Sequence, residues 1–271
     1  MTNVILDYLF VVVFKWGLAG AGIATIFGQF IGAIMSIVYF IKENNSLLQL
    51  VKTRFYKRIL LKACTNGSSE LMTNISASII NILYNFQLMK IAGENGIAAY
   101  GVIMYASFVF SAIYIGYSIG TAPIIGYHYG AKNDNELKNL FKKSLIIIAL
   151  TGVMMTGLAE IFASPLAKIF VAYDQKLFDM TCHGFRLYAF SFLLSGFNIW
   201  GSGFFTALGD GLISAILAFL RTLVFQIIVV LFLPLILGLD GIWLSVVIAE
   251  VLALIVTLFF FIKKKDKYHY I

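Results

Sequence analysis

Five polar side chains follow one face of a predicted helix between Glu70 and Asn85. At about 100° per residue, Glu70, Asn74, Ser78, Asn81 and Asn85 fall within about 80° of arc, and apolar residues fill the other faces. A carboxylate beside amide and hydroxyl oxygens suits a hard cation such as Na⁺. In a dry site the same carboxyl would carry a proton instead. The stripe therefore predicts an ion-coupling site at Glu70, or else a hydrogen bond from Glu70 to a neighbouring helix.

The composition places this stripe in a membrane protein. Hydrophobic residues make up 61% of the chain and charged residues 12%, whereas soluble domains are roughly half apolar and a quarter charged. A carboxylate on a membrane helix faces a protein interior or a water-filled cavity. The two cysteines and three histidines share no ligand spacing, and they predict neither a disulfide framework nor a metal centre. We expect an all-α polytopic membrane protein with no metal beyond Na⁺ at Glu70.

Eight apolar segments are candidates for the ~20 residues that cross a bilayer. The first has only about 13 residues and starts almost at Met1, as a span without its beginning would, so we expect helices to be missing before it. The segments are Val4–Trp16, Leu18–Ile41, Ile59–Ile91, Ile97–Tyr127, Leu140–Ala163, Phe185–Leu208, Leu212–Leu237 and Ile242–Ile262.

Basic residues mark alternate connections between these segments. Fourteen of the 20 Lys and Arg residues lie in the stretches 42–62, 132–143 and 263–267. The positive-inside rule places these stretches in the cytoplasm, and the net charge of +7 follows from topology rather than from a nucleic-acid partner. The links Gly93–Gly96 and Gly238–Gly241 then lie outside, and both chain ends lie inside.

The connector at residues 42–58 has its own pattern. Leu47, Leu50, Val51 and Phe55 recur at helical spacing among basic residues, which predicts an amphipathic helix in the membrane interface. A solvated tether and a linker between two lobes are both open interpretations. The chain thus divides into residues 1–41, a cytoplasmic linker at 42–58, and residues 59–271.

An internal repeat relates the two ends of the chain. Gly17–Gln29 aligns without gaps on Gly238–Glu250, with Gly, Leu and Gly matching at the front and Gln29 meeting Glu250 at the back. The first two spans therefore correspond to the last two. Since the last two close a unit of six spans, the first two would close another unit whose first four spans are absent. Parallel repeats of this kind are common in secondary transporters.

Four motifs carry a resemblance to a known family. They are Gly96–Tyr105, Ala122–Lys132, Phe204–Gly209 and Gly238–Glu250. Together they resemble the second lobe of a MATE (multidrug and toxic compound extrusion) transporter of the DinF-like bacterial branch. The resemblance implies two six-helix bundles, with residues 1–41 ending the first lobe and 59–271 forming the second. It also implies export of organic cations or amphiphilic drugs across the bacterial cell membrane in exchange for Na⁺ or H⁺, with no cofactor.

The resemblance also assigns roles to single residues. Glu70 lies where sodium-coupled members place a glutamate of their cation site. The tenth-helix aspartate of those members has no counterpart, because Phe185–Leu208 contains no acid. Asp7, in the motif Asn3–Asp7, resembles a first-lobe coupling residue of the DinF-like members. The family's Gln-Pro is Ala122-Pro123 here.

Six further side chains are candidates to line a substrate cavity. Arg221 lies inside a span, where a cation must pair or reach the interface, so both an anchoring role and ligand contact are open. Glu250, near mid-span, should face the interior, where it serves in helix packing or in gating. The full set is Tyr84, Asn85, Tyr105, Tyr114, Arg221 and Glu250.

Three other functional classes deserve comparison with an exporter. A lipid-linked oligosaccharide flippase of the same superfamily would present several cations to its cavity, and only Arg221 is available. A non-transporting membrane fragment or a receptor-like protein would need neither the repeat nor the polar stripe. The sequence shows no motif that predicts an enzyme: it has no paired carboxylates, no nucleophile with a base, and no phosphate-binding loop. The expected partners are drugs, membrane lipids and the missing helices of the first lobe.

Overall fold

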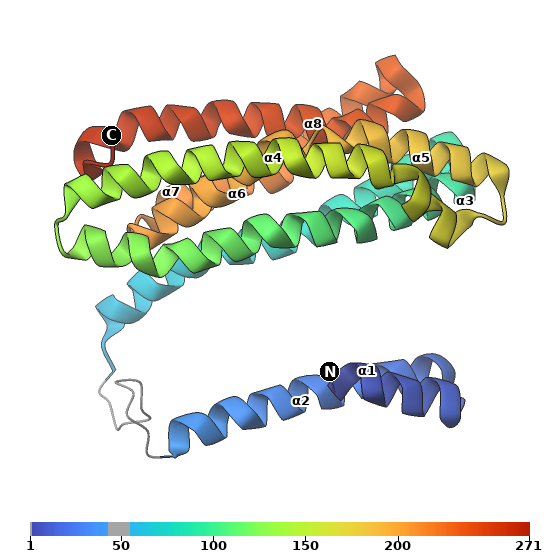
Figure 1. Cartoon of the computed structure of the whole chain (residues 1–271), viewed down its shortest axis with the longest axis horizontal. Coiled ribbons are helices and arrows are strands. Elements are labelled where there is room, and N and C mark those ends of the chain that lie inside the picture. The colour runs from blue at the N-terminus through green and yellow to red at the C-terminus, as the bar shows by residue number, and fades with distance from the viewer. Residues whose placement is uncertain (1, 43–54) are drawn as a thin grey trace. The chain divides into compact units, whose positions relative to one another are not determined.

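The computed structural model describes residues 2–42 and 55–271 (Figure 1). Every regular element in these ranges is helical, which confirms the all-α prediction. The chain divides into two compact units, Met1–Tyr56 and Lys57–Ile271. Most of the predicted linker at 42–58 lies outside the described residues.

The first unit is a hairpin of two helical segments. Helix α1 (Thr2–Asp7) continues into the π-helix η1 (Tyr8–Val13), and α2 (Gly17–Ile41) follows a short turn. Gly17 has a φ of +58°, a backbone conformation that glycine adopts at little cost. A Cβ at Gly20 would lie 3.0 Å from the carbonyl oxygen of Phe10. The absence of that carbon lets α2 pack closely against the preceding segment.

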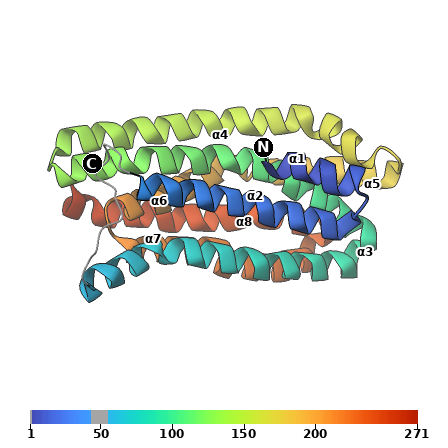
Figure 2. The same cartoon turned by 90° about the horizontal axis from the view of Figure 1, so that it is seen from below.

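The second unit begins with α3 (Lys57–Gly130), which is broken at Gly93 by φ of 64° and ψ of −153°. A straight helix of its 74 residues would be about 110 Å long, several times the ~30 Å bilayer core. The break gives two arms, which meet at one end of the bundle in Figure 2. The expected link at Gly93–Gly96 is therefore present as a helix break.

Two long stretches of helix follow α3. Asn133 caps α4 (Asp134–Val171) by accepting a hydrogen bond from the Glu136 N–H at 3.2 Å. Helix α5 (Gln175–Ala189) and helix α6 (Phe192–Ala207) are separated by only two residues. The apolar segments give the wrong ends here: α4 runs to Val171 rather than Ala163, and α5 starts at Gln175 rather than Phe185. Pro165 lies inside α4, and the first turns of α5 are rich in polar residues, so the apolar segments alone indicated neither extension.

The last part of the chain is nearly continuous helix. Helix α7 (Gly211–Phe219) passes through the π-helix η2 (Leu220–Val224) into α8 (Phe225–Tyr268). Gly238 breaks α8 with φ of 58°. A Cβ at Gly241 would lie 2.6 Å from the carbonyl oxygen of Leu233.

The aligned repeat has a shared local structure. Gly17 and Gly238 both have φ of +58°, and each turns the chain into a new helix. Gly20 and Gly241 both lie against the backbone of the preceding segment. The matching glycines are thus needed for the same two physical reasons at both ends of the chain.

In the part of the chain that the structure describes, four helical stretches are long and apolar enough to cross a membrane: Gly17–Ile41, Lys57–Gly130, Asp134–Val171 and Gly211–Tyr268. The second and fourth contain the breaks at Gly93 and Gly238, so each supplies two of the expected crossings. Helices α5 and α6, with 15 and 16 residues, are each short of the ~20 residues needed and follow one another as a single crossing. These elements give the polytopic architecture that the apolar segments predict.

Hydrogen bonds join the C-terminal end of α8 to the N-cap of α7. Asp210 caps α7 and accepts hydrogen bonds from the Tyr268 hydroxyl and, at 3.3 Å, from Lys267 Nζ. These groups lie beyond the apolar spans. Burial opposes ionisation of Asp210, but the hydrogen bonds from Tyr268, Lys267 and the Ile213 N–H outweigh it and hold the carboxyl pKa below its ordinary value.

Candidate functional site

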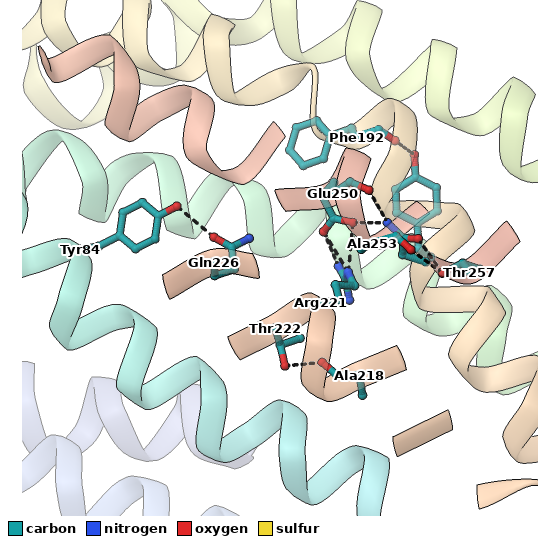
Figure 3. A network of polar contacts seen from close by, with 11 residues as sticks. Tyr84, Phe192, Ala218, Arg221, Thr222, Gln226, Glu250, Ala253 and Thr257 are labelled. Atoms are coloured by element: carbon teal, nitrogen blue, oxygen red, sulfur yellow. Dashed lines mark hydrogen bonds and ion pairs between the residues drawn. The ribbon is translucent and has the colours of Figure 1, made fainter. Parts of the chain in front are cut away.

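Arg221 and Glu250 form an ion pair inside the second unit (Figure 3). Arg221 Nη2 lies 2.8 Å from Glu250 Oε1, and Arg221 Nε donates to Oε1 at 2.9 Å and to Oε2 at 3.1 Å. Glu250 is 3% exposed. Of the two alternatives for Arg221, pairing or reaching the interface, the structure has pairing, and Glu250 faces the interior as expected.

Asn198 extends this pair to a third helix. Its amide nitrogen, on α6, donates to Glu250 Oε2 at 2.6 Å and to the Glu250 backbone oxygen at 3.0 Å. The Thr257 hydroxyl lies 2.9 Å from Asn198 Oδ1 and donates to it. A buried carboxylate needs both a partner and hydrogen bonds, and this network supplies them to Glu250.

Arg221 lies where the helix changes from α to π. It lies in η2, where the backbone departs from α-helical hydrogen bonding, and such π segments occur frequently at functional sites. The next residue, Thr222, donates its hydroxyl to the Ala218 carbonyl at 2.7 Å (Figure 3). Arg221 projects from this π segment and pairs with Glu250 on α8.

Two adjoining cavities lie beside this network. The smaller has a volume of about 170 Å³ and includes Arg221, Glu250 and Gln226 in its wall. The larger, of about 560 Å³, lies between the two arms of α3. Tyr100 and Met104 line both cavities. The remaining residues of the larger wall are Asn81, Asn85, Ile97, Gly101, Tyr105 and Phe108.

Tyrosine rings shape the boundary between the cavities. Tyr84 and Tyr100 stack with ring centroids 4.9 Å apart and planes 5° from parallel. The Tyr84 hydroxyl donates to Gln226 Oε1 at 3.1 Å (Figure 3). The smaller cavity therefore combines stacked aromatic rings with a hydrogen-bonded Tyr84–Gln226 pair in its wall.

The polar stripe of α3 lies on an exposed face of the second unit. Asn81 and Asn85 line the larger cavity, whereas Glu70, Asn74 and Ser78 line neither cavity. Asn74 Nδ2 donates to the Glu70 backbone oxygen at 2.8 Å, and Asn85 Nδ2 donates to the Asn81 backbone oxygen at 2.8 Å. These amide groups bond to their own helix, and the role of Glu70 in ion coupling stays a prediction.

The other candidate residues are distributed differently. Tyr105 is 75% exposed at the larger cavity, while Tyr114 is 2% exposed in the core and donates to the Phe192 carbonyl at 2.8 Å. Asp7, in the first unit, is half-buried, and its Oδ1 has no hydrogen-bond partner in the described part of the chain. Within residues 2–42 and 55–271, no group of three or more His, Cys, Asp or Glu side chains is placed to hold a metal ion.

The sequence analysis missed three polar residues near the ion pair: Asn198 and Thr257 in the network, and Gln226 in the wall of the smaller cavity. All three are buried, with exposures of 2%, 8% and 1%. A polar side chain inside an apolar span is the signal that would have found them, since such a group needs a partner within the protein.

The sequence matches the family model MatE over residues 71–232. Two curated relatives are the multidrug export proteins MepA of Staphylococcus saprophyticus and Staphylococcus aureus. They are 26% identical to this chain over 252 and 250 residues, which is 92% of this chain in both comparisons. The matched part is 54% of each relative, so the chain spans about half the length of these proteins.

Solved structures share the fold at low identity. A MOP superfamily transporter from Pyrococcus furiosus matches 98% of this chain and 60% of its own, with a TM-score of 0.89 and 22% identity. A MATE crystallised in complex with MaL6 matches 98% and 61% of the two chains, with a TM-score of 0.88 and 22% identity.

Proposed function

This chain belongs to the MatE family, and on that premise we propose that it works as part of a secondary multidrug exporter. The multidrug export proteins among its relatives support the proposal over 92% of the chain. Residues 59–271 would form the second lobe, and residues 1–41 would be the last two helices of the first. Transport needs both lobes, because the substrate path lies between them in repeat-built transporters.

The single observation that carries the proposal is the larger cavity. Its volume of about 560 Å³ falls within the ~300–1,000 Å³ typical of sites for small molecules. The wall combines Tyr100, Tyr105 and Phe108 with the amides of Asn81 and Asn85. Aromatic faces with a few hydrogen-bonding groups suit amphiphilic drugs, including aromatic organic cations held over a ring face.

For ion coupling we propose Glu70, with Asn74, Ser78 and Asn81 as neighbouring oxygen donors and with Na⁺ or H⁺ as the ion. Asp7 of the first unit is the alternative coupling residue. Glu250 is a weaker candidate, because Arg221 and Asn198 already occupy both of its carboxylate oxygens. No cofactor beyond the coupling ion and no catalytic step enter this proposal.

Export is tested in a bacterium that lacks its own exporters, with the protein in a form that carries a complete first lobe. Ethidium should accumulate less in these cells than in cells with an empty vector. Glu70→Gln should abolish the ion-driven part of the effect. Glu94→Gln, at an exposed glutamate just after the Gly93 break in α3, should leave the ion-driven part intact. If Glu70→Gln exports ethidium at the wild-type rate at every pH and Na⁺ concentration, Asp7 rather than Glu70 is the coupling residue.

We further propose a cell-membrane location with both chain ends in the cytoplasm, surrounded by lipid. A flippase for a lipid-linked oligosaccharide has less support. The pyrophosphate of such a lipid needs several cations. Among the described residues, the only basic side chain in the walls of the two cavities is Arg221, which is paired with Glu250.

A further inference from the structure

We propose that the smaller cavity is an anion subsite, which takes the carboxylate of an amphiphile whose aromatic part lies in the larger cavity. The proposal rests on the proposed export function and names a substrate class for it: aromatic carboxylates and zwitterions. It concerns residues of the second unit alone.

The two charges beside the cavity are unequally exposed. The Arg221 side chain is 20% exposed, whereas the Glu250 side chain is 4% exposed. Both side chains belong to the wall of the smaller cavity, but the carboxylate is the less accessible of the two, and Asn198 on α6 donates to one of its oxygens. The guanidinium is therefore the charged group that a ligand in the smaller cavity can reach more readily.

Arg221 has donors to spare for a second acceptor. Glu250 engages Nε and Nη2, which form one edge of the planar guanidinium. Arginine carries N–H groups on its other edge too, in a geometry that matches a carboxylate. Gln226 adds another donor, because its Oε1 accepts from Tyr84 and its amide nitrogen is the group that can donate.

Apart from Glu250, no acidic side chain among the described wall residues of the two cavities competes with a ligand for Arg221. The described wall of the larger cavity carries no ionisable acid or base other than tyrosine. A permanent cation in that cavity would be held by ring faces alone. A ligand with a carboxylate would gain a charge-assisted hydrogen bond in addition.

The two volumes fit the two halves of such a ligand. Tyr100 and Met104 belong to both walls, so the cavities are neighbours. The smaller, at about 170 Å³, has room for a carboxylate with a few waters, and the larger, at about 560 Å³, for a fused aromatic system. A short flexible chain between ring and carboxylate would pass Met104.

The test compares 1-pyrenebutyric acid with its methyl ester, which share the ring and chain and differ in the charge. Binding to the 271-residue chain in phosphatidylcholine nanodiscs is measured by equilibrium dialysis, with empty nanodiscs to subtract partition into lipid. We expect the acid to bind about tenfold more tightly than the ester, as one added charge-assisted hydrogen bond would give.

Two variants separate this role from a structural one. The double variant Arg221→Gln with Glu250→Gln removes both charges and leaves no buried ion unpaired, and in it the preference for the acid should vanish while the ester binds as before. Glu250→Gln alone removes the internal competitor for the guanidinium, so the acid should bind several-fold more tightly. An anchoring role for Arg221 predicts neither change.

Equal binding of acid and ester to the unmodified chain would overturn the proposal. A preference for the acid that survives in the double variant would overturn it too, and so would an absence of binding by either compound. In the first two cases ester binding is retained, and the export function is judged separately by the ethidium assay.

Discussion

Removing Arg221 alone should destabilise the second unit more than removing Arg221 and Glu250 together. Arg221→Gln leaves a carboxylate that is 4% exposed with only Asn198 as a partner, and such a loss costs about 3–5 kcal/mol. Glu250→Gln leaves a guanidinium that is 20% exposed and therefore partly solvated, so we expect a loss of about 1–3 kcal/mol. The double variant should lose less than Arg221→Gln alone.

The assay is unfolding of the purified chain by titration of SDS into mild-detergent micelles, at pH 7. The unmodified chain, the two single variants and the double variant form a double-mutant cycle, which gives the coupling free energy between the two side chains. We expect at least about 1.5 kcal/mol, within the range measured for residues that share one hydrogen-bonded network.

A control cycle uses the exposed pair of His183 and Asp240, whose side chains are 2.8 Å apart and 58% and 50% exposed. With His183→Gln and Asp240→Asn the coupling should stay below about 1 kcal/mol. Additive losses at Arg221 and Glu250, or equal coupling in both cycles, would refute the description of the pair as buried and interdependent.

Three further predictions concern packing, pH and ligand contact. Gly196→Ala should lose about 1–3 kcal/mol in the same SDS titration because its Cβ would lie 2.6 Å from the Tyr114 ring, whereas Gly157→Ala, with no atom within 4 Å, should not. The pKa of Asp210 is lower in the folded state than its ordinary value of 3.8, so the stability that Asp210 contributes is present above pH 3.8 and is lost as pH falls through the folded pKa. Asp210→Asn can still cap α7, and it should flatten the acid side of a plot of melting temperature against pH. An unchanged slope would contradict this. Tyr105→Ala should weaken binding of an aromatic dye about tenfold and Tyr105→Phe much less, as measured by equilibrium dialysis; equal losses would show that the hydroxyl rather than the ring makes the contact.

The parts of the fold that depend on local chemistry were predictable. Apolar length identified the spans, and glycine at Gly93 and Gly238 identified the breaks, because a helix that must reverse needs a residue that tolerates positive φ. The helix end at Val171 was not predictable, because Pro165 lies inside α4 and a proline usually ends or kinks a helix. The start of α5 was not predictable either, because polar residues in a helical turn and in a loop look alike in one sequence.

The site was predictable only in pieces. Arg221 and Glu250 each stood out as charges within a span, but their pairing depends on how η2 packs against α8, which no local pattern encodes. Asn198 and Gln226 were missed because a single amide among apolar residues is a weak signal. Glu70 stood out for its spacing, yet its neighbours on α3 use their amide groups on their own helix. Spacing along one helix defines a face, whereas tertiary packing decides what that face meets.

The most direct test of the central claim is dye movement in proteoliposomes under an imposed ion gradient. With a form that carries a complete first lobe, ethidium should move against its own gradient when a Na⁺ or pH gradient is imposed in the opposite direction, and should stop when the gradient is collapsed. The 271-residue chain in matched vesicles should show no such movement. Dye movement that is the same with and without the ion gradients, or absent from the form with both lobes, would contradict the account.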